Sequence, residues 1–372
     1  MRTRKWLALA VGAAPLLVGL GAGTAAAQDP TTGKVDNIGY GTRAGEFLLL
    51  PVGARAAAMG QAFSALADDA TALYWNPAGI SFLGQRSIHV THLDYLAGTS
   101  YTWGGLAVPL GMGNWVVGVQ LGGFNFGEAP VYTVEEPDGT GSTYTNSMFV
   151  LGGSVAMNVT DRFSFGGSVK YVQESLANTS GSTLALDIGT NYHTEIAGRP
   201  FRAAFSILNL GGEIAPTGSD LVVNVPNLDP STPDRTDQAV LRTQSFPLPV
   251  MFKVGLGWDA LSTPTSRLTV AGEFWQPQQN NTSTALGLEY TLRPDAVRGV
   301  SFSLRGGYTY EPDRSYEAGG INFDDEASDG LAFGGGILYQ PSETGFGLGI
   351  DYAYRQLGLL GNVNMFSLSL RW

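Results

Sequence analysis

The side chains that could perform acid–base chemistry or hold a metal ion are few in this sequence. It contains three histidines. His89 and His92 lie three residues apart in a stretch that reads as a β-strand, so their side chains should point to opposite faces, and His193 stands alone in another stretch. Neither a Gly-x-Ser-x-Gly nucleophile motif nor a His-Glu-x-x-His zinc motif is present. We therefore expect a protein that is not an enzyme and carries no cofactor.

Carboxylates gather most densely in the stretch EPDRSYEAGGINFDDEASDG. Asp324, Asp325, Glu326 and Asp329 offer the hard oxygen ligands that calcium prefers. Their spacing lacks the regular pattern of a defined calcium loop, so the sequence favours a solvated surface loop and leaves calcium binding open. We predict no metal site elsewhere in the chain.

Alternation of apolar and polar residues is the strongest pattern in the chain. In the stretch VSFSLR, Val300, Phe302 and Leu304 share one face, and polar residues occupy the other. About fourteen stretches read as such strands, near residues 87–98, 101–110, 114–124, 145–158, 161–176, 182–194, 200–210, 247–258, 266–276, 283–292, 299–310, 329–340, 345–356 and 363–372. The pattern predicts an all-β protein.

The composition indicates which kind of β-protein this is. Only 14% of the residues are charged, 11% are aromatic and 51 are glycine. No apolar run of about 18 residues follows the N-terminal region, which excludes a helical membrane span there. A soluble β-sandwich would have polar outer faces, whereas one face of nearly every stretch here is apolar. These features are typical of a transmembrane antiparallel β-barrel, whose strands need only about ten residues each.

The N-terminal residues 1–27 resemble a secretory signal peptide. Basic residues precede an apolar run, and Ala25, Ala26 and Ala27 form a cleavage pattern before Gln28. An N-terminal membrane anchor is the alternative. Removal of the segment leaves 18 basic and 32 acidic residues, a net charge of −14, which does not suit nucleic-acid binding. The chain has no cysteine, so no disulfide supports the exported protein.

The lengths of the connections supply an independent test of the barrel. If the first strand runs outward, the three long connections, residues 125–144, 211–246 and 311–328, all fall on the outer side. Bacterial outer-membrane barrels have long outer loops and short periplasmic turns. We therefore expect a barrel over residues 87–372 in the outer membrane of a Gram-negative-type bacterium, surrounded by its lipid, with both mature termini in the periplasm.

The final strand ends the chain on an aromatic residue. Phe366, Leu368, Leu370 and Trp372 share one face of the stretch NVNMFSLSLRW. This pattern is similar to the C-terminal signal that the barrel-assembly machinery recognises. The alternative is any β-protein that ends on a hydrophobic strand.

Residues 28–86 differ from everything that follows, because residues 53–79 are small, apolar and suited to short helices. A barrel of about eight strands can just be filled by its own side chains, so fourteen strands need a plug or enclose an open pore. Asp68 or Asp69 can cap a helix over residues 70–75, and either can pair with Arg55. Pro77 should end that helix. The plug motif that we single out comprises Gly53, Arg55, Asp68, Asp69, Trp75, Asn76, Pro77 and Gly79.

Charged residues on the inward faces of the predicted strands are of both signs. They are Lys170, Lys253, Arg305, Arg355 and Arg371 against Asp187, Glu273, Glu289 and Asp351. Buried charges need partners. A balanced lining therefore favours a polar network around a plug over an ion-selective pore.

The stretch GEFLLLPVGARAAAMGQAFSALADDATALYWNPAGI resembles the N-terminal signature of the PorV/PorQ family, within the FadL-like outer-membrane barrels. The Gly-Ala-Arg, Ala-Asp-Asp-Ala and Trp-Asn-Pro-Ala-Gly elements carry the resemblance. It implies a fourteen-strand barrel with an N-terminal plug. The PorV/PorQ branch serves type IX secretion of proteins, and the FadL branch passes hydrophobic molecules.

Two functions follow from this resemblance. The first is export or surface handling of proteins, with exported proteins or other secretion components as partners of the outer loops. The alternative is passive transport of a hydrophobic ligand, which needs a break in the wall. Gly122 and Gly123 mark a possible kink for that purpose, although glycines there can also make room for bulky neighbours.

Overall fold

The computed structural model describes residues 42–111, 114–226, 236–278, 282–311, 314–318, 321–325, 330–341 and 345–372. The predicted signal peptide, residues 1–27, lies outside the described residues, as do the first residues of the predicted plug segment.

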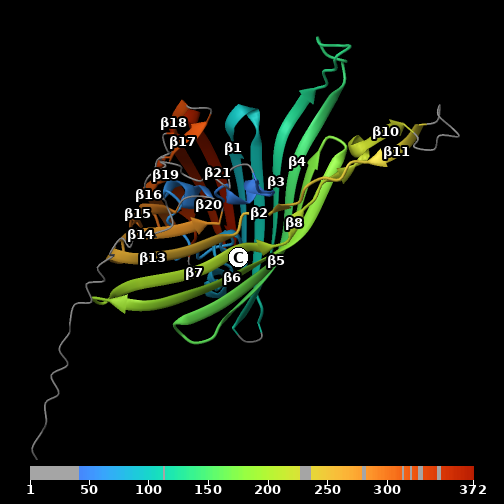
Figure 1. Ribbon diagram of the computed structural model, residues 1–372. Coiled ribbons are helices and arrows are strands. Elements are labelled where there is room, and N and C mark those ends of the chain that lie inside the picture. Colours follow the sequence, from blue (N-terminus) through green and yellow to red (C-terminus); the bar gives the residue numbers. More distant parts are fainter. Residues whose placement is uncertain are drawn as a thin grey trace, which may run out of the picture.

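Fourteen antiparallel strands form one closed barrel, as predicted (Figure 1). Each strand pairs with its neighbours in chain order, and β1 pairs with β21 to close the ring. The strands are β1 (Ser87–Asp94), β2 (Ser100–Pro109), β3 (Trp115–Pro130), β4 (Thr143–Asn158), β5 (Phe163–Leu176), β6 (Thr179–Ile196), β7 (Arg199–Gly211), β13 (Met251–Ser262), β14 (Ser266–Pro277), β15 (Ser283–Leu292), β16 (Val300–Tyr310), β19 (Gly330–Tyr339), β20 (Gly347–Gln356) and β21 (Asn362–Arg371).

Strict alternation of burial explains why these residues form a barrel wall. Along β15, Ala285 and Glu289 point inward and are buried, whereas Leu286, Leu288 and Tyr290 point outward and are exposed. The same alternation recurs on other strands, so the barrel has an apolar outer surface and a lumen that contains most of the charged wall residues. This is the reverse of a soluble barrel and the arrangement that a lipid surrounding favours.

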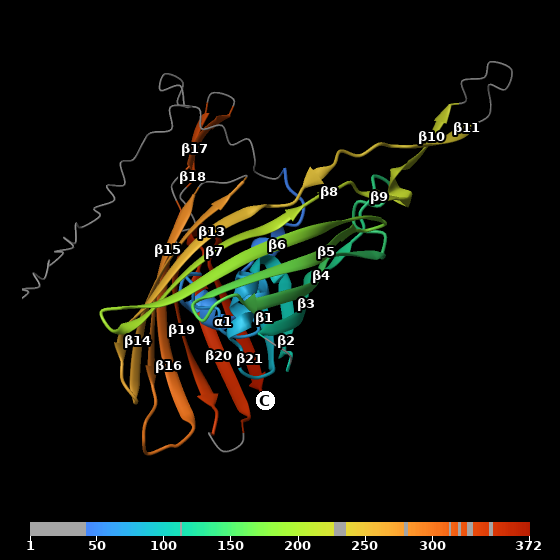
Figure 2. The same ribbon diagram turned by 90° about the horizontal axis from the view of Figure 1, so that it is seen from below.

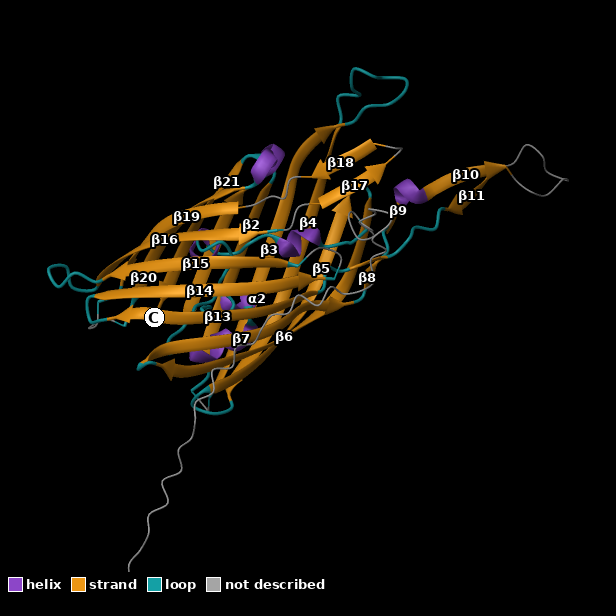
Figure 3. Ribbon diagram, turned by 60° about the vertical axis from the view of Figure 1, so that its left-hand side comes forward, coloured by secondary structure: helices purple, strands orange, loops and turns teal. Residues whose placement is uncertain are grey.

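The long connections leave the barrel at one end, which we call the long-loop end; the opposite end is the short-turn end. Strands β3 and β4 project beyond their neighbours there as a two-stranded ribbon (Figures 1 and 3). Because of this extension, the first long connection is shorter than the predicted 125–144. The connection after β7 contains β8 (Glu213–Ile214), β9 (Thr217–Gly218), η4 (Ser219–Leu221), β10 (Val222–Pro226), β11 (Thr236–Val240) and β12 (Phe246–Pro247), and that after β16 contains β17 (Arg314–Ala318) and β18 (Ile321–Asp325).

The segment before β1 lies inside the ring of strands (Figure 2). It contains four short helices, η1 (Glu46–Leu49), α1 (Ala54–Ala58), α2 (Ala72–Trp75) and η2 (Pro77–Phe82), while η3 (Leu96–Gly98) and η5 (Gly358–Leu360) lie in connections between strands. Most of its residues from Val52 to Ile80 are buried. We call residues 42–83 the plug. Among the described residues, no helix is long and apolar enough to cross a membrane.

Glycines on the inner wall allow the plug to approach the strands at backbone distance. A Cβ atom at Gly307 would lie 2.1 Å from the carbonyl carbon of Met59, and one at Gly166 would lie 2.6 Å from the amide nitrogen of Ala78. Gly255 and Gly287 likewise face backbone atoms of the plug, whereas Gly118, Gly189 and Gly334 make room for the plug side chains of Leu73, Asn76 and Ala58. Many of the glycines are therefore required by the packing of the plug rather than by turns.

Candidate functional site

Of the four helices of the plug, only η2 begins at a side-chain cap. Asp69 Oδ1 accepts a hydrogen bond from the backbone N–H of Thr71 at 2.8 Å in the turn before α2, but the N-cap residue of α2 is Thr71, so neither Asp68 nor Asp69 caps this helix as predicted. Helix α2 is shorter than the predicted 70–75 and starts at Ala72. Pro77 ends α2 but also starts η2, because its fixed φ and missing N–H suit a first helical turn. Asn76 Oδ1 caps η2 by accepting from the N–H of Ala78 at 3.1 Å.

Trp75 and Asn76 connect the plug to itself and to the wall. Trp75 Nε1 donates to the carbonyl of Val52 at 2.7 Å, and Lys253 Nζ lies 4.3 Å from the centre of the Trp75 ring. Asn76 Nδ2 donates to the carbonyl of Thr190 on β6 at 3.0 Å. These residues of the predicted motif therefore lie where plug and wall meet.

The two glycines that flank the motif are needed for backbone reasons. Gly53 precedes α1 with φ +87°, a conformation that other residues rarely adopt. A Cβ atom at Gly79 would lie 2.2 Å from the carbonyl oxygen of Ala67. Both positions therefore exclude larger residues in this packing.

Arg55 joins the plug to the barrel wall. Its Nε and Nη2 atoms lie 2.7 and 2.9 Å from the two carboxylate oxygens of Glu289 on β15, a bidentate arrangement. Its Nη1 lies 2.6 Å from Asp68 Oδ1. Of the two candidate partners in the plug, the structure thus pairs Arg55 with Asp68, whereas Asp69 accepts from Thr71 in the turn before α2.

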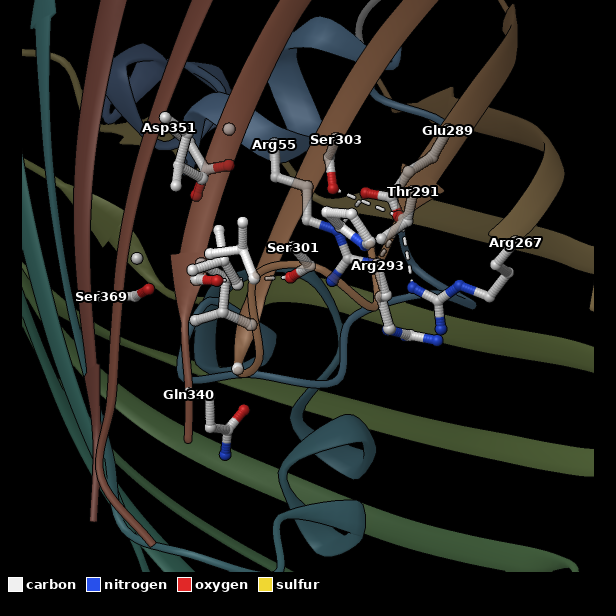
Figure 4. Close-up of a pocket in the computed structure, with 18 of the residues that line it drawn as sticks. Arg55, Arg267, Glu289, Thr291, Arg293, Ser301, Ser303, Gln340, Asp351 and Ser369 are labelled. Carbon is white, nitrogen blue, oxygen red and sulfur yellow. Dashed lines mark hydrogen bonds and ion pairs between the residues drawn. The ribbon is translucent and has the colours of Figure 1, made fainter. Parts of the chain in front are cut away.

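Glu289 is shared by three guanidinium groups. Arg305 Nε lies 2.8 Å and Arg267 Nη2 3.3 Å from its oxygens, in addition to Arg55. Arg305 also reaches Asp351 Oδ1 at 2.5 Å. We call these five residues together with Asp68 the latch (Figure 4).

The charged neighbours of Asp68 lower the pKa of its carboxyl. Desolvation alone would raise the pKa of the Asp68 carboxyl, but Arg55, and then Arg371, hold that pKa below its ordinary value. The carboxylate therefore stays ionised, which keeps its attraction to Arg55.

The remaining predicted lumenal charges also face inward, and most have partners. Lys170 Nζ lies 2.8 Å from Asp187 Oδ1, and Lys253 Nζ lies 3.8 Å from Glu273 Oε1. Glu273 also accepts from the backbone N–H of Ser64 in the plug at 2.8 Å. Sequence reasoning missed further inward charges that the strand alternation could have indicated, among them Glu174, Arg202, Asp259 and Arg267.

A polar cavity of about 800 Å³ lies between the plug and the short-turn end (Figure 4). We call it the vestibule. Its arginines are Arg55, Arg267, Arg293, Arg298, Arg305 and Arg371, and its carboxylates are Asp68, Asp69, Glu289, Asp295 and Asp351. Because both signs are present in similar number, the vestibule offers an ionic, hydrated surface and no preference for one sign of charge.

An apolar row lines one sector of the wall on the long-loop side. Met365, Leu93, Tyr101 and Phe124 stand opposite one another across the adjacent strands β21, β1, β2 and β3, and all four are buried. The ring of Phe47 in the plug packs edge-on against Tyr101, with centroids 6.2 Å apart. This sector of the wall therefore differs from the charged vestibule.

The backbone ladder of the wall is interrupted between β7 and β13. These strands pair regularly up to Leu208 opposite Met251, and pairing resumes as β8 with β12, where Glu213 faces Pro247. Between these pairs, residues 209–212 and 248–250 form no strand pairing with each other. Pro249 has no N–H to donate. We call this region the β7–β13 interruption.

Side chains and the plug fill the interruption from inside. Leu248 is buried, and Asn209 Nδ2 donates to the carbonyl of Pro249 at 3.1 Å. The backbone N–H of Ala44 donates to the carbonyl of Pro247 at 3.1 Å, and a Cβ at Gly45 would lie 2.8 Å from Leu248 Cδ2. The leucines on the outer face around it are exposed: Leu184, Leu186 and Leu210.

Gly122 and Gly123, considered as a possible kink, lie in a regular part of the wall. Strand β3 pairs with β2 and β4 in unbroken register through both residues, and its irregularity falls between Asn125 and Glu128. A Cβ at Gly122 would lie 2.6 Å from Tyr101 Oη and would also crowd the neighbouring strand. Gly122 therefore makes room for bulky neighbours.

The residues of the predicted assembly signal lie on the last strand of the ring. The side chains of Phe366, Leu368 and Trp372 are exposed on the outer face, and Leu370 is partly buried. The N–H of Trp372 donates to the carbonyl of Arg86 at 3.1 Å, so the chain end is fixed next to the start of β1. Recognition by the assembly machinery stays a prediction.

The acidic stretch and the histidines form no site among the described residues. Asp324 and Asp325 belong to β18, whereas Glu326 and Asp329 lie outside the described residues. His89 is buried and His92 is exposed, as their spacing predicts. Within the part of the chain that the structure describes, no group of three His, Asp or Glu side chains could hold a metal ion.

Comparisons with known proteins identify the fold. No family model and no curated protein matches the sequence. The CymD monoaromatic hydrocarbon channel has a TM-score of 0.52 at 12% identity, covering 87% of this chain and 97% of that one. A mutant of the TodX monoaromatic hydrocarbon channel has a TM-score of 0.51 at 13% identity, covering 86% and 97%. A Pseudomonas aeruginosa FadL homologue has a TM-score of 0.49 at 12% identity, covering 87% and 98%. At these identities the first two likenesses show a common fold.

Proposed function

We propose that this protein is an outer-membrane channel that takes small apolar molecules from the long-loop end and releases them sideways into the bilayer through the β7–β13 interruption. The interrupted ladder is the observation that carries the proposal. It leaves residues 209–212 and 248–250 unpaired, whereas the irregularities within β3–β4, β6–β7 and β13–β14 skip only one or two residues of a strand. The two similar structures are both described as monoaromatic hydrocarbon channels, which supports an apolar cargo.

The location and orientation are part of the same proposal. An apolar outer surface and a signal peptide suit the outer membrane, and the long loops would then face outward. Both ends of the mature chain would face the periplasm.

Chemistry of the lumen favours a sideways path over a straight one. The row formed by Leu93, Tyr101, Phe124 and Met365 is apolar but buried, so an apolar molecule would reach it only when the groups that cover it move aside. A straight path leads through the plug into the vestibule, where the molecule would displace water from charged groups without replacing their hydrogen bonds. The interruption leads past Leu248 and Leu208 to an outer surface that is itself apolar.

A disulfide across the interruption tests the proposal. The chain has no cysteine, so introduced pairs react without competition. Extending the β8–β12 register places Leu210 opposite Val250. We expect oxidised L210C/V250C protein to lose uptake of radiolabelled toluene by a Gram-negative host, and reduction of the disulfide to restore it.

The matched control joins the same two strands where the ladder is already continuous. Ala203 stands opposite Leu256 in that register. Oxidised A203C/L256C protein should take up toluene as well as the reduced form does. Undiminished uptake in oxidised L210C/V250C protein, with the cross-link verified by mass spectrometry, would refute the sideways path.

A second candidate function is the handling of exported proteins, as the PorV/PorQ resemblance implies. Large apolar side chains exposed in the long connections favour it, notably Tyr132, Val134 and Val240. Replacing Tyr132 and Val134 by serine should then abolish retention of a type IX cargo protein at the cell surface and leave toluene uptake intact. Unchanged retention would count against this candidate.

A further inference from the structure

Three buried polar residues from neighbouring strands meet at the edge of the interruption. Lys170 on β5, Asp187 on β6 and Asn209 on β7 are only 6%, 1% and 3% exposed. Lys170 Nζ lies 2.8 Å from Asp187 Oδ1 and also donates to Asn209 Oδ1. The backbone N–H of Asn209 donates to Asp187 Oδ1 at 2.8 Å.

The backbone is irregular at the same place. The β6–β7 register shifts between Leu186 and Ile188, so that Leu208 and Asn209 together oppose Asp187. Asn209 has φ +60°, in the left-handed region. Asparagine tolerates this conformation far better than β-branched residues do. The three side chains therefore fix a bulge in β7.

The interruption begins at this bulge. The last regular β7–β13 pair is Leu208 with Met251, and the next residue is Asn209. Across the interruption, the side chain of Asn209 replaces a backbone bond: its Nδ2 donates to the carbonyl of Pro249, which precedes β13. A bulge bends its strand and disrupts the ladder locally.

We propose that Lys170, Asp187 and Asn209 are positioning residues that hold β7 away from the segment 248–250 and so create the β7–β13 interruption. A buried ion pair is a weak means of stabilising a wall, because desolvation offsets most of its attraction. Its effect here is geometric: it holds the carboxylate that anchors the left-handed Asn209. The transport consequence rests on the proposed function, whereas the geometric one does not.

The test measures geometry and transport separately. In purified protein carrying the L210C/V250C pair, the rate of oxidative cross-linking reports how closely β7 approaches residue 250. Asn209→Thr disfavours positive φ and should let the ladder extend, so cross-linking should accelerate by about tenfold or more. Asn209→Gly permits positive φ and should change the rate by less than about twofold.

A double variant removes the ion pair without leaving an unpaired charge. K170M/D187N retains an oxygen acceptor at position 187 but loses the attraction that orients it, and it should also accelerate cross-linking. The K170M/D187N variant tests the positioning role on its own if Asn209→Thr protein does not assemble. The A203C/L256C pair should cross-link at the same rate in every background.

The outcomes distinguish the two proposals. Cross-linking that is not accelerated in folded Asn209→Thr protein, or in K170M/D187N protein where the first does not fold, overturns the positioning role whatever happens to transport. Accelerated cross-linking with unchanged toluene uptake supports the positioning role and contradicts the proposed function. Accelerated cross-linking together with reduced uptake supports both.

Discussion

The latch allows a quantitative prediction about how firmly the plug is held. Glu289 is buried, and three guanidinium groups share its charge, from Arg55, Arg267 and Arg305. Glu289→Gln removes that charge and leaves the three cations facing one another. Removing one partner of a buried ion pair typically costs about 3–5 kcal/mol. The plug should therefore open at least about 100-fold more often, since each 1.4 kcal/mol is about a factor of ten.

Arg55→Met should have a smaller effect although it removes the bridge itself. Glu289 keeps Arg305 at 2.8 Å and Arg267 at 3.3 Å, so no buried charge is left without a partner. Asp68 is about half-exposed and regains water. The loss is then confined to charge-assisted hydrogen bonds, partly offset by rehydration, and we expect about 2 kcal/mol, or about a 30-fold increase in opening.

Amide hydrogen exchange in detergent micelles measures these openings directly. Exchange of the α1 amides should accelerate by the factors given, while the amides of β4 and β5, on the far side of the ring from Glu289, should not change. A protein lacking residues 53–79 provides the limit of a barrel without a plug, and it should conduct ions in planar bilayers where the intact protein stays nearly silent. If Arg55→Met opens the plug more than Glu289→Gln does, the argument from shared charge is wrong.

Three further predictions concern packing, assembly and pH. Gly307→Ala should expel the plug and raise conductance, because its Cβ would meet Met59, whereas Gly306→Ala should behave like the unchanged protein because its Cβ has only one distant neighbour. Replacing Phe366 and Trp372 with serine should sharply lower the amount of heat-modifiable barrel on gels, and normal amounts would show that these aromatics only face lipid. Because the pKa of Asp68 is lowered, the ion pair of Asp68 contributes fully to plug stability above the ordinary carboxyl pKa, and this contribution is lost as the pH falls through the lowered value. Amide hydrogen exchange of α1 should therefore accelerate in acid. Asp68→Asn should remove much of that acid dependence.

The barrel could be predicted from the sequence because its determinants are local. A period of two places Leu286 and Leu288 outward and Glu289 inward without knowledge of any partner strand. The same period assigned the charges of the lumen to the correct face. Strand ends were less well defined, since β3 and β4 continue as a ribbon beyond the barrel, where no change in residue pattern marks the rim.

The partners within the site could not be predicted in the same way. Arg55 and Glu289 are separated by 234 positions, and nothing local indicates that the side chain of Arg55 on α1 reaches β15. The choice between Asp68 and Asp69 depends on which carboxylate folds back onto Thr71 in the turn before α2, and adjacent residues of the same type give no signal for this. The balance of inward charges predicted a polar network around the plug, but it did not predict which residues pair with one another.

Glycine pairs illustrate why a wall break cannot be located from the sequence alone. Gly122 and Gly123 suggest a kink, but the side chains that decide the outcome, Tyr101 and Val150, stand on the two neighbouring strands and need the space that Gly122 leaves. The interruption lies instead where Gly211 and Gly212 face a segment with two prolines. Glycine alone only permits a ladder to break. Proline has no backbone N–H, so the opposite segment can donate fewer hydrogen bonds to β7. Fewer bonds are therefore broken when a bulge turns β7 away. A glycine pair is therefore a stronger indication of a wall break when the strand predicted to face it contains proline.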